Sequence, residues 1–205
     1  MNNKKIQLKN STKISVKNLD LQTHIRKFLI AMGENPDRGG LIDTPKRFEK
    51  TVKYLLSGYD RSFEEEKSIF ENDVKYKDII FLKNIDFFSL CEHHFLPFFG
   101  FVHIGYIPSK DGYLGISKLA RAVDIFSKRL QNQEILSFQI AEALMQHGKA
   151  KGVAILIEAR HLCNVARGVQ KRAAVMTTCA YYGEFEKNNK AQQQFLELIR
   201  DREKV

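Results

Sequence analysis

The sequence predicts an α+β domain built on a mainly antiparallel sheet. Two segments rich in β-branched and aromatic residues precede a pair of helices, and two further strand-like segments follow that pair. Helical periodicity returns at both ends of the chain. Strands and helices that occur in separate runs favour an α+β arrangement over a parallel α/β sheet. The 205 residues suit one domain of ordinary size with a helical extension.

The N-terminal part is predicted to be helical after a flexible basic tail. Apolar residues recur at helical spacing between residues 21 and 32. Thr44 and Pro45 are typical of a second helix start, because Thr caps the first turn and Pro is tolerated within it. We expect three parts: a tail over 1–18, a helical region over 19–60 and a main domain over 61–205.

The main domain is expected to begin with a charged, exposed connection over residues 62–77. Its apolar periodicity then predicts strands over 79–88 and 99–106, one helix carrying Leu119 through Leu130, a break at 131–132, a second helix carrying Ile135 through Leu144, strands over 153–159 and 173–182, and a C-terminal helix around Phe195. The sheet should therefore have four antiparallel strands, with two helices between the strand pairs.

Composition and charge restrict the possible partners. The formal charge of +9 indicates acidic partners such as nucleic acid, an anionic membrane or a phosphorylated small molecule. No apolar run approaches the roughly 18 residues of a membrane span, and the first residues lack the apolar core of a secretory signal. Three cysteines, two of them beside histidines, fit a reducing compartment. We expect a cytoplasmic protein that binds neither membrane nor nucleic acid.

Two segments carry candidate metal ligands. Cys91 and His94 have C-x-x-H spacing, and Cys163 follows a second histidine, His161. A Cys2His set with an open fourth position is typical of catalytic zinc, whereas structural zinc is usually closed by four protein ligands. The alternative is a buried cysteine with hydrogen-bonded histidines. If His94 binds the metal, an extended segment would turn its neighbour His93 away.

Four ordered blocks resemble GTP cyclohydrolase I, a zinc enzyme of pterin and tetrahydrofolate biosynthesis. They are NPDRGGLIDTPKRFEK, CEHHFLPFFGFVHIGYIP, LGISKLARAVDIFSKRLQNQE and EARHLCNVARGVQK, and they extend from about Asn35 to Lys171. The resemblance implies the tunnelling fold, in which subunits pool their sheets into an oligomeric barrel. It also implies a homo-oligomer, typically a decamer of two stacked pentamers.

The resemblance further implies a reaction and its residues. GTP would be hydrolysed at C8 of guanine by water activated on Zn²⁺, with His161 protonating N7 and His93 assisting proton transfer. Formate and 7,8-dihydroneopterin triphosphate would be the products. Glu134 would accept two N–H groups from the guanine edge, next to Gln133. The other implied substrate-binding residues, most of them basic and reaching the triphosphate, are Ser117, Lys118, Arg121, Arg167, Arg47 and Lys50.

One block departs from the family pattern. Most members carry a Ser/Thr-rich run after ARGVQK, whereas this chain has Ala174 and Met176 within residues 174–179. Lost hydroxyls could weaken binding or change the product, which leaves open a paralogue that binds nucleotide in a regulatory role. Two further alternatives are a deazaguanine nitrile reductase of the same fold, which needs no zinc, and a basic zinc module for nucleic acid, which needs four closed ligands.

Overall fold

The computed structural model describes residues 20–200, so the predicted tail over 1–18 lies outside the described residues. Contacts divide the chain into two compact units, residues 1–52 and 53–205. In the first unit, helix α1 (Leu21–Ala31) begins where Asp20 accepts hydrogen bonds from the next turn. Helix α2 (Thr44–Leu55) begins at the predicted Thr44-Pro45 and runs into the second unit. The predicted domain boundary at residue 60 stays a prediction.

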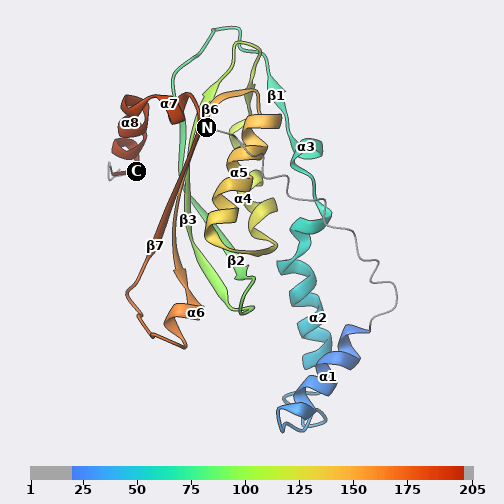
Figure 1. The fold of residues 1–205 in the computed structure, drawn as a ribbon. Coiled ribbons are helices and arrows are strands. Elements are labelled where there is room, and N and C mark those ends of the chain that lie inside the picture. The colour runs from blue at the N-terminus through green and yellow to red at the C-terminus, as the bar shows by residue number, and fades with distance from the viewer. Residues whose placement is uncertain (1–19, 201–205) are drawn as a thin grey trace, which may run out of the picture. The chain divides into compact units, whose positions relative to one another are not determined.

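The second unit is built on a five-stranded sheet of order β5-β2-β3-β6-β7 (Figure 1). Its four long strands are antiparallel neighbours, which confirms the predicted α+β class. They are β2 (Ile80–Cys91), β3 (Pro97–Pro108), β6 (Ala150–His161) and β7 (Met176–Gly183). The fifth strand, β5 (Leu130–Gln131), was not predicted, and it pairs in parallel with the last two residues of β2.

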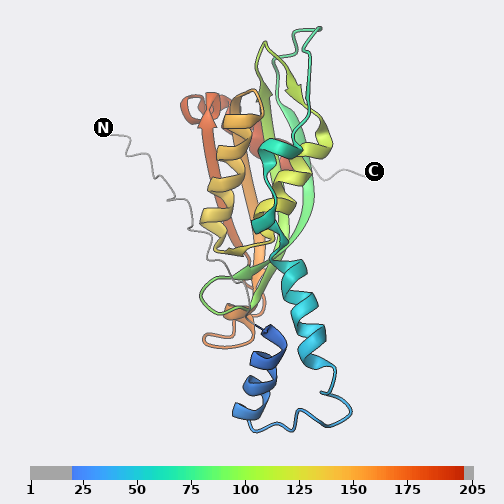
Figure 2. The ribbon, with the colours of Figure 1, turned by 90° about the vertical axis from the view of Figure 1, so that its right-hand side faces the viewer.

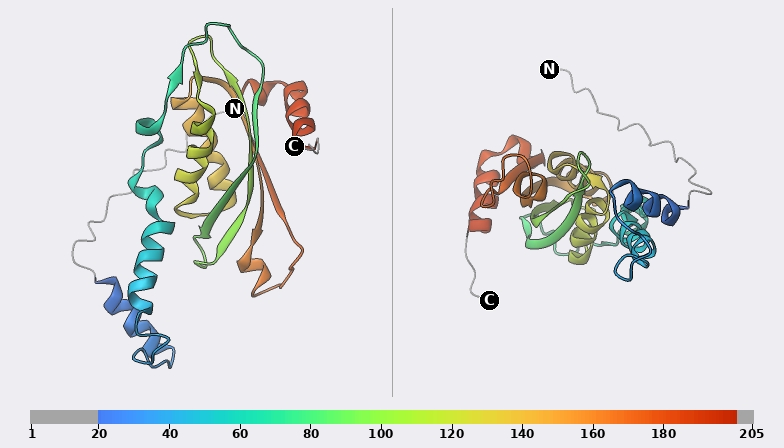
Figure 3. Two further views of the ribbon diagram at one scale, coloured as in Figure 1. Left: turned by 180° about the vertical axis from the view of Figure 1, so that it is seen from behind. Right: turned by 90° about the horizontal axis from the view of Figure 1, so that it is seen from below.

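Helices cover both faces of this sheet. Helices α4 (Ile116–Ser127) and α5 (Gln133–His147) pack on one face, and α7 (Glu184–Lys187) and α8 (Asn189–Arg200) lie on the other (Figure 2). The view from behind shows the same layers (Figure 3). Alternate strand residues such as Val102, Ile104, Ile155 and Ile157 are fully buried beneath α4 and α5. Strand periodicity therefore sends every second side chain into this core.

The segment over residues 62–77 is mostly exposed, as predicted, but it also contains short regular elements. A 3-10 turn (Ser57–Asp60) precedes this segment. The segment itself holds a short helix α3 (Phe63–Glu66) and strand β1 (Ile69–Phe70), which pairs with β4 (Tyr113–Leu114). Phe63 is only 3% exposed and joins the core. Arg61 pairs with Glu66 of this segment and with Asp124 of α4, so these two ion pairs tie the segment to the helix.

The ends of the strands decide where the candidate site lies. Strands β2 and β6 both run antiparallel to β3, so Cys91 and His161, the last residues of these strands, lie at the same end of the sheet. A short helix α6 (Leu162–Val165) follows His161 and carries Cys163. In the described residues, no helix combines the length and the apolar character that a membrane crossing requires.

Candidate metal centre and substrate site

The turn between β2 and β3 shapes the first two candidate ligands. Cys91 N–H donates to Leu96 O at 2.8 Å, and Phe95 N–H donates to Cys91 O at 2.8 Å. Phe95 completes the reversal in the left-handed region, with φ of 55°. Because the chain folds back here, Nδ1 of His94 lies 3.7 Å from Sγ of Cys91. The C-x-x-H spacing thus brings a thiol and an imidazole together.

Cys163 joins this pair from α6, which is distant in the sequence from the turn between β2 and β3. The ligand atoms of Cys91, His94 and Cys163 all lie within 4.8 Å of one another. Zinc–sulfur bonds of about 2.3 Å and zinc–nitrogen bonds of about 2.0–2.1 Å separate tetrahedral donors by roughly 3.5–3.8 Å. Burial, followed by the nearby Cys91, raises the pKa of the Cys163 thiol. A dication would reverse that shift, so the donor set fits a thiolate-binding metal.

His93 does not turn away from this group. Its Nδ1 lies 3.8 Å from Sγ of Cys91, and its ring meets that of His94 edge-on. The expectation that neighbouring side chains diverge was wrong because residues 92–95 form a turn and not an extended strand. Nε2 of His93 also lies 3.8 Å from a carboxylate oxygen of Glu92. His93 therefore remains close to the candidate metal ligands.

Strand β5 joins the start of α5 to the ligand turn. Glu92 N–H donates to Gln131 O at 2.9 Å, and the Asn132 side-chain amide donates to Glu92 at 2.7 Å. Asn132 also caps α5, because its Oδ1 accepts from Ile135 N–H at 2.8 Å. Sequence reasoning missed these links, although an Asn before a helix is a readable capping signal. They place the first turn of α5, with Glu134, beside the metal ligands.

His161 is held on the face of the sheet that α4 and α5 cover. Its ring stacks on Phe98, with centroids 4.6 Å apart, and its Nε2 lies 2.8 Å from Oε1 of Gln133. Burial lowers the pKa of His161, while the charge of Glu134 opposes that shift. Glu134 itself is exposed in the first turn of α5. The charge of Glu134 therefore reaches the His161 ring.

The expected phosphate-binding residues are dispersed. Arg167 follows α6, and its charge partly opposes the rise that burial causes in the pKa of the Cys163 thiol. On α4, Arg121 instead contacts Glu66 at 3.3 Å. At about 1.5 Å of rise per residue, Lys118 lies roughly 14 Å along α4 from the end that leads into β5, and Ser117 lies one residue further. Within one chain these α4 residues are thus remote from the metal ligands. Arg47 and Lys50 are exposed on α2 in the first unit, and Arg47 pairs with Asp43.

The departing block keeps one hydroxyl inside the fold. Ala174 and Met176 are both exposed, so the hydroxyls expected there would not be buried in this chain. Thr178 is instead the inward-facing residue, and its Oγ1 lies 2.9 Å from Ser137 Oγ and 3.2 Å from Gln133 Nε2. Thr178 therefore supplies the β7 hydroxyl that is hydrogen-bonded inside the fold.

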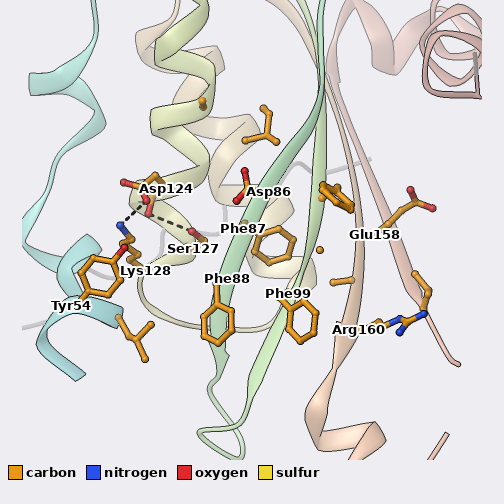
Figure 4. Close-up of a pocket in the computed structure, with 17 residues that line it drawn as sticks. Tyr54, Asp86, Phe87, Phe88, Phe99, Asp124, Ser127, Lys128, Glu158 and Arg160 are labelled. Atoms are coloured by element: carbon orange, nitrogen blue, oxygen red, sulfur yellow. Dashed lines mark hydrogen bonds and ion pairs between the residues drawn. The ribbon is translucent and has the colours of Figure 1, made fainter. Parts of the chain in front are cut away.

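A separate cavity of about 1120 Å³ opens beside the β2 edge (Figure 4). Phe88 and Phe99 stack within it, and Asp124 and Lys128 form an ion pair on its helical side. None of the three candidate metal ligands lines it. This cavity is therefore distinct from the cluster of ligands and histidines.

The sequence is similar to known proteins over most of its length. A model of the family described as GTP cyclohydrolase I matches residues 21–200. GTP cyclohydrolase 1 of Coxiella burnetii is 48% identical over 179 residues, which cover 86% of this chain and 96% of the relative. GTP cyclohydrolase 1 of Campylobacter jejuni is 46% identical over 183 residues, covering 88% and 95%. A solved archaeosine synthase of QueF-like type is a distant likeness, with 18% identity, a TM-score of 0.41 and coverage of 52% and 94%.

Proposed function

The chain belongs to the GTP cyclohydrolase I family, and we propose on that premise that it is a zinc-dependent enzyme that hydrolyses GTP at C8 of guanine. The products are formate and 7,8-dihydroneopterin triphosphate, which supply pterin and tetrahydrofolate biosynthesis. The observation that carries the proposal is the convergence of Cys91, His94 and Cys163, with His161 at the same end of the sheet. Cys91, His94 and Cys163 would hold the ion, which when bound supplies Lewis-acid activation of water.

The remaining residues of the cluster bind the base and move protons. Glu134 accepts hydrogen bonds from N1 and the 2-amino group of guanine, which selects against bases that lack these donors. His161 gives a proton to N7, because an imidazole can exchange protons near neutral pH. His93, which also lies beside Cys91, assists proton transfer as the ring opens. Arg167 binds the triphosphate from the loop after α6.

A homo-oligomer would explain how the α4 residues that are remote from the metal ligands in one chain could still contact the substrate. We propose that another copy presents Ser117, Lys118 and Arg121 to the metal-bearing end, in a decamer of two pentamers. Two observations support subunit contact here. In the described residues, only the last two residues of β2 have a strand partner on its outer side. The exposed Phe88, Phe99 and Phe101 also gather near that edge.

The altered block favours an active enzyme over a regulatory paralogue. The two replaced positions, 174 and 176, are exposed, whereas the retained Thr178 lies in the internal hydrogen-bond network. Binding of GTP without turnover would require a defect elsewhere in the cluster. The grouping of Cys91, His94 and Cys163, together with the hydrogen bond that holds His161, supports turnover.

The deciding experiment incubates the purified protein with GTP and zinc. Formate is measured directly, and pterin is detected by its fluorescence after oxidation. Stoichiometric formate and a fluorescent pterin product are expected. GTP binding without formate would replace the proposed reaction by the regulatory role. A protein that neither binds GTP nor releases formate would contradict both functions.

A further inference from the structure

Gln133 is the most completely enclosed polar side chain near the cluster. It is 0% exposed, although it is the first residue of α5 and adjoins the exposed Glu134. Burying an amide without hydrogen bonds would cost a few kcal/mol, so its partners should reveal what it does. A residue that contacts the base would need a free polar atom in the site.

The amide nitrogen of Gln133 has no hydrogen left for a substrate. It lies 3.0 Å from Ile157 O, 3.0 Å from Met176 O and 3.2 Å from Thr178 Oγ1. Both carbonyl oxygens can only accept hydrogen bonds, so the NH₂ group must face them. The orientation of the side chain is therefore determined, and its oxygen points the other way, toward His161.

The side-chain oxygen of Gln133 determines which ring nitrogen of His161 carries the hydrogen. Oε1 of Gln133 is an acceptor only, and it lies 2.8 Å from His161 Nε2. Nε2 must therefore carry the hydrogen, which makes Nδ1 the unprotonated nitrogen of the neutral ring. Stacking on Phe98 fixes the plane of the same ring. In the described part of the chain, no hydrogen bond engages Nδ1 of His161.

We propose that Gln133 is a positioning residue that holds His161 with its hydrogen on Nε2 and leaves Nδ1 to meet the substrate. The inference rests on the proposed function for its catalytic meaning. Nδ1 is then the atom through which a proton supplied by solvent would pass to N7 of guanine, while the Nε2–H bond to Gln133 is kept. Of the two adjacent residues, only Glu134 contacts the base. Gln133 instead fixes the orientation and the tautomer of His161.

Two substitutions of similar length separate positioning from packing. Gln133→Glu keeps an acceptor facing His161, and Gln133→Met removes it. Both lose the amide hydrogens that bind the carbonyls of Ile157 and Met176, so both should lose stability. If Gln133 positions His161, the Met variant should lose at least about tenfold in kcat with KM nearly unchanged, and the Glu variant should recover most of that loss. A wrong histidine tautomer costs about 10⁴-fold in the serine-protease triad, so an effect above tenfold is reasonable.

The tautomer can be read directly in the metal-loaded wild type. Long-range ¹H–¹⁵N spectra of ¹⁵N-histidine-labelled protein, recorded without substrate and at a pH where the ring is neutral, distinguish Nε2–H from Nδ1–H. The His161 signals are assigned by their absence in His161→Gln. A single Nε2–H form in the wild type, lost in Gln133→Met, is expected. A proton on Nδ1, a mixture of forms, or equal kcat in the Glu and Met variants would overturn the proposal.

This design keeps the two proposals separate. The wild-type spectrum needs neither turnover nor a variant that folds, so it decides the orientation of His161 on its own. If His161 shows the Nε2–H form but the wild type releases no formate, the positioning stands and the proposed reaction fails. If formate is released from a protein whose His161 carries its hydrogen on Nδ1, the reaction stands and the positioning fails.

Discussion

Asn132 and Glu92 are joined by a hydrogen bond of 2.7 Å that ties the first turn of α5 to the metal-ligand turn. The same asparagine caps the helix through its Oδ1 atom. Asn132→Asp should keep the cap but place a carboxylate against Glu92. Asn132→Ala should lose the cap as well, at a cost of about 0.5–2 kcal/mol in the free energy of unfolding.

Both substitutions should therefore weaken metal retention, and only Asn132→Ala should also lose substantial thermal stability. Metal content after dialysis against a chelator, together with the melting temperature, checks this prediction. Equal metal retention in wild type and both variants would show that the link between α5 and the turn does not support the ligands.

The metal prediction is tested with the cysteines. Cys163→Ala should remove stoichiometric zinc and abolish formate release, because two remaining ligands hold an ion poorly. The matched control is Cys179→Ala, since Cys179 is exposed on β7 and lies outside the ligand group. Elemental analysis of the purified proteins gives the result. Wild-type protein without a specific metal ion would contradict the assignment.

Glu134 is predicted to read the guanine edge. Glu134→Gln should weaken GTP binding by about ten- to a hundredfold, because losing a charged hydrogen-bond partner costs about 1.5–3 kcal/mol. ITP, which lacks the 2-amino group, should bind the wild type poorly. Titrations of GTP and ITP with wild type, Glu134→Gln and the exposed control Glu184→Gln provide the comparison. Equal affinity of the wild type for the two nucleotides would contradict this role.

The departing block can be restored. Ala174→Ser with Met176→Thr should lower the KM for GTP severalfold without changing zinc content, if hydroxyls at these exposed positions reach the triphosphate. A neutral hydrogen bond contributes only about 0.5–1.5 kcal/mol, so the basic residues should still dominate affinity. Thr178→Val should instead reduce thermal stability, because it removes the inward hydroxyl shared with Ser137. Steady-state kinetics and melting curves check both. Formate from the double revertant alone would favour the regulatory paralogue for the natural chain.

Acid stability should depend on Glu66. Its hydrogen bond from Arg61, followed by that from Arg121, holds the pKa of Glu66 below its ordinary value of 4.5. A depressed pKa contributes stability above the unfolded pKa, and that contribution is lost as the pH falls through the folded pKa. Glu66→Gln should therefore lower stability near neutral pH and flatten its decline below about pH 4.5. Urea unfolding at several pH values tests this, with the exposed Glu65→Gln as control.

The long elements were predictable because burial imposes a period on the sequence. Residues 153–159 read as a strand, and β6 extends through them to His161 with alternate side chains in the core. The spacing of Cys91 and His94 likewise predicted a ligand pair that the structure brings together with Cys163. These features depend on local sequence and on regular geometry.

Other features depend on partners that no local pattern encodes. Strand β5 has only two residues, too few for any periodicity, and Leu130 was expected to continue the helix that ends at Ser127. The His93 side chain points toward Cys91 because residues 92–95 form a turn and do not continue the preceding strand. The hydrogen bonds of Gln133 involve backbone carbonyls of β6 and β7, which the sequence around residue 133 cannot specify.

The register of β3 against β6 implies an order of assembly. Cys91 and Cys163 are distant in the sequence, and Phe98 faces His161 at one end of the β3–β6 ladder, so the ligands meet only when these strands are paired. An ion therefore meets the complete ligand set after long-range strand pairing has been completed. Zinc binding should follow folding of the sheet and should not nucleate it. The metal-free chain should then refold at nearly the same rate as the metal-loaded chain, and zinc should act mainly by slowing unfolding.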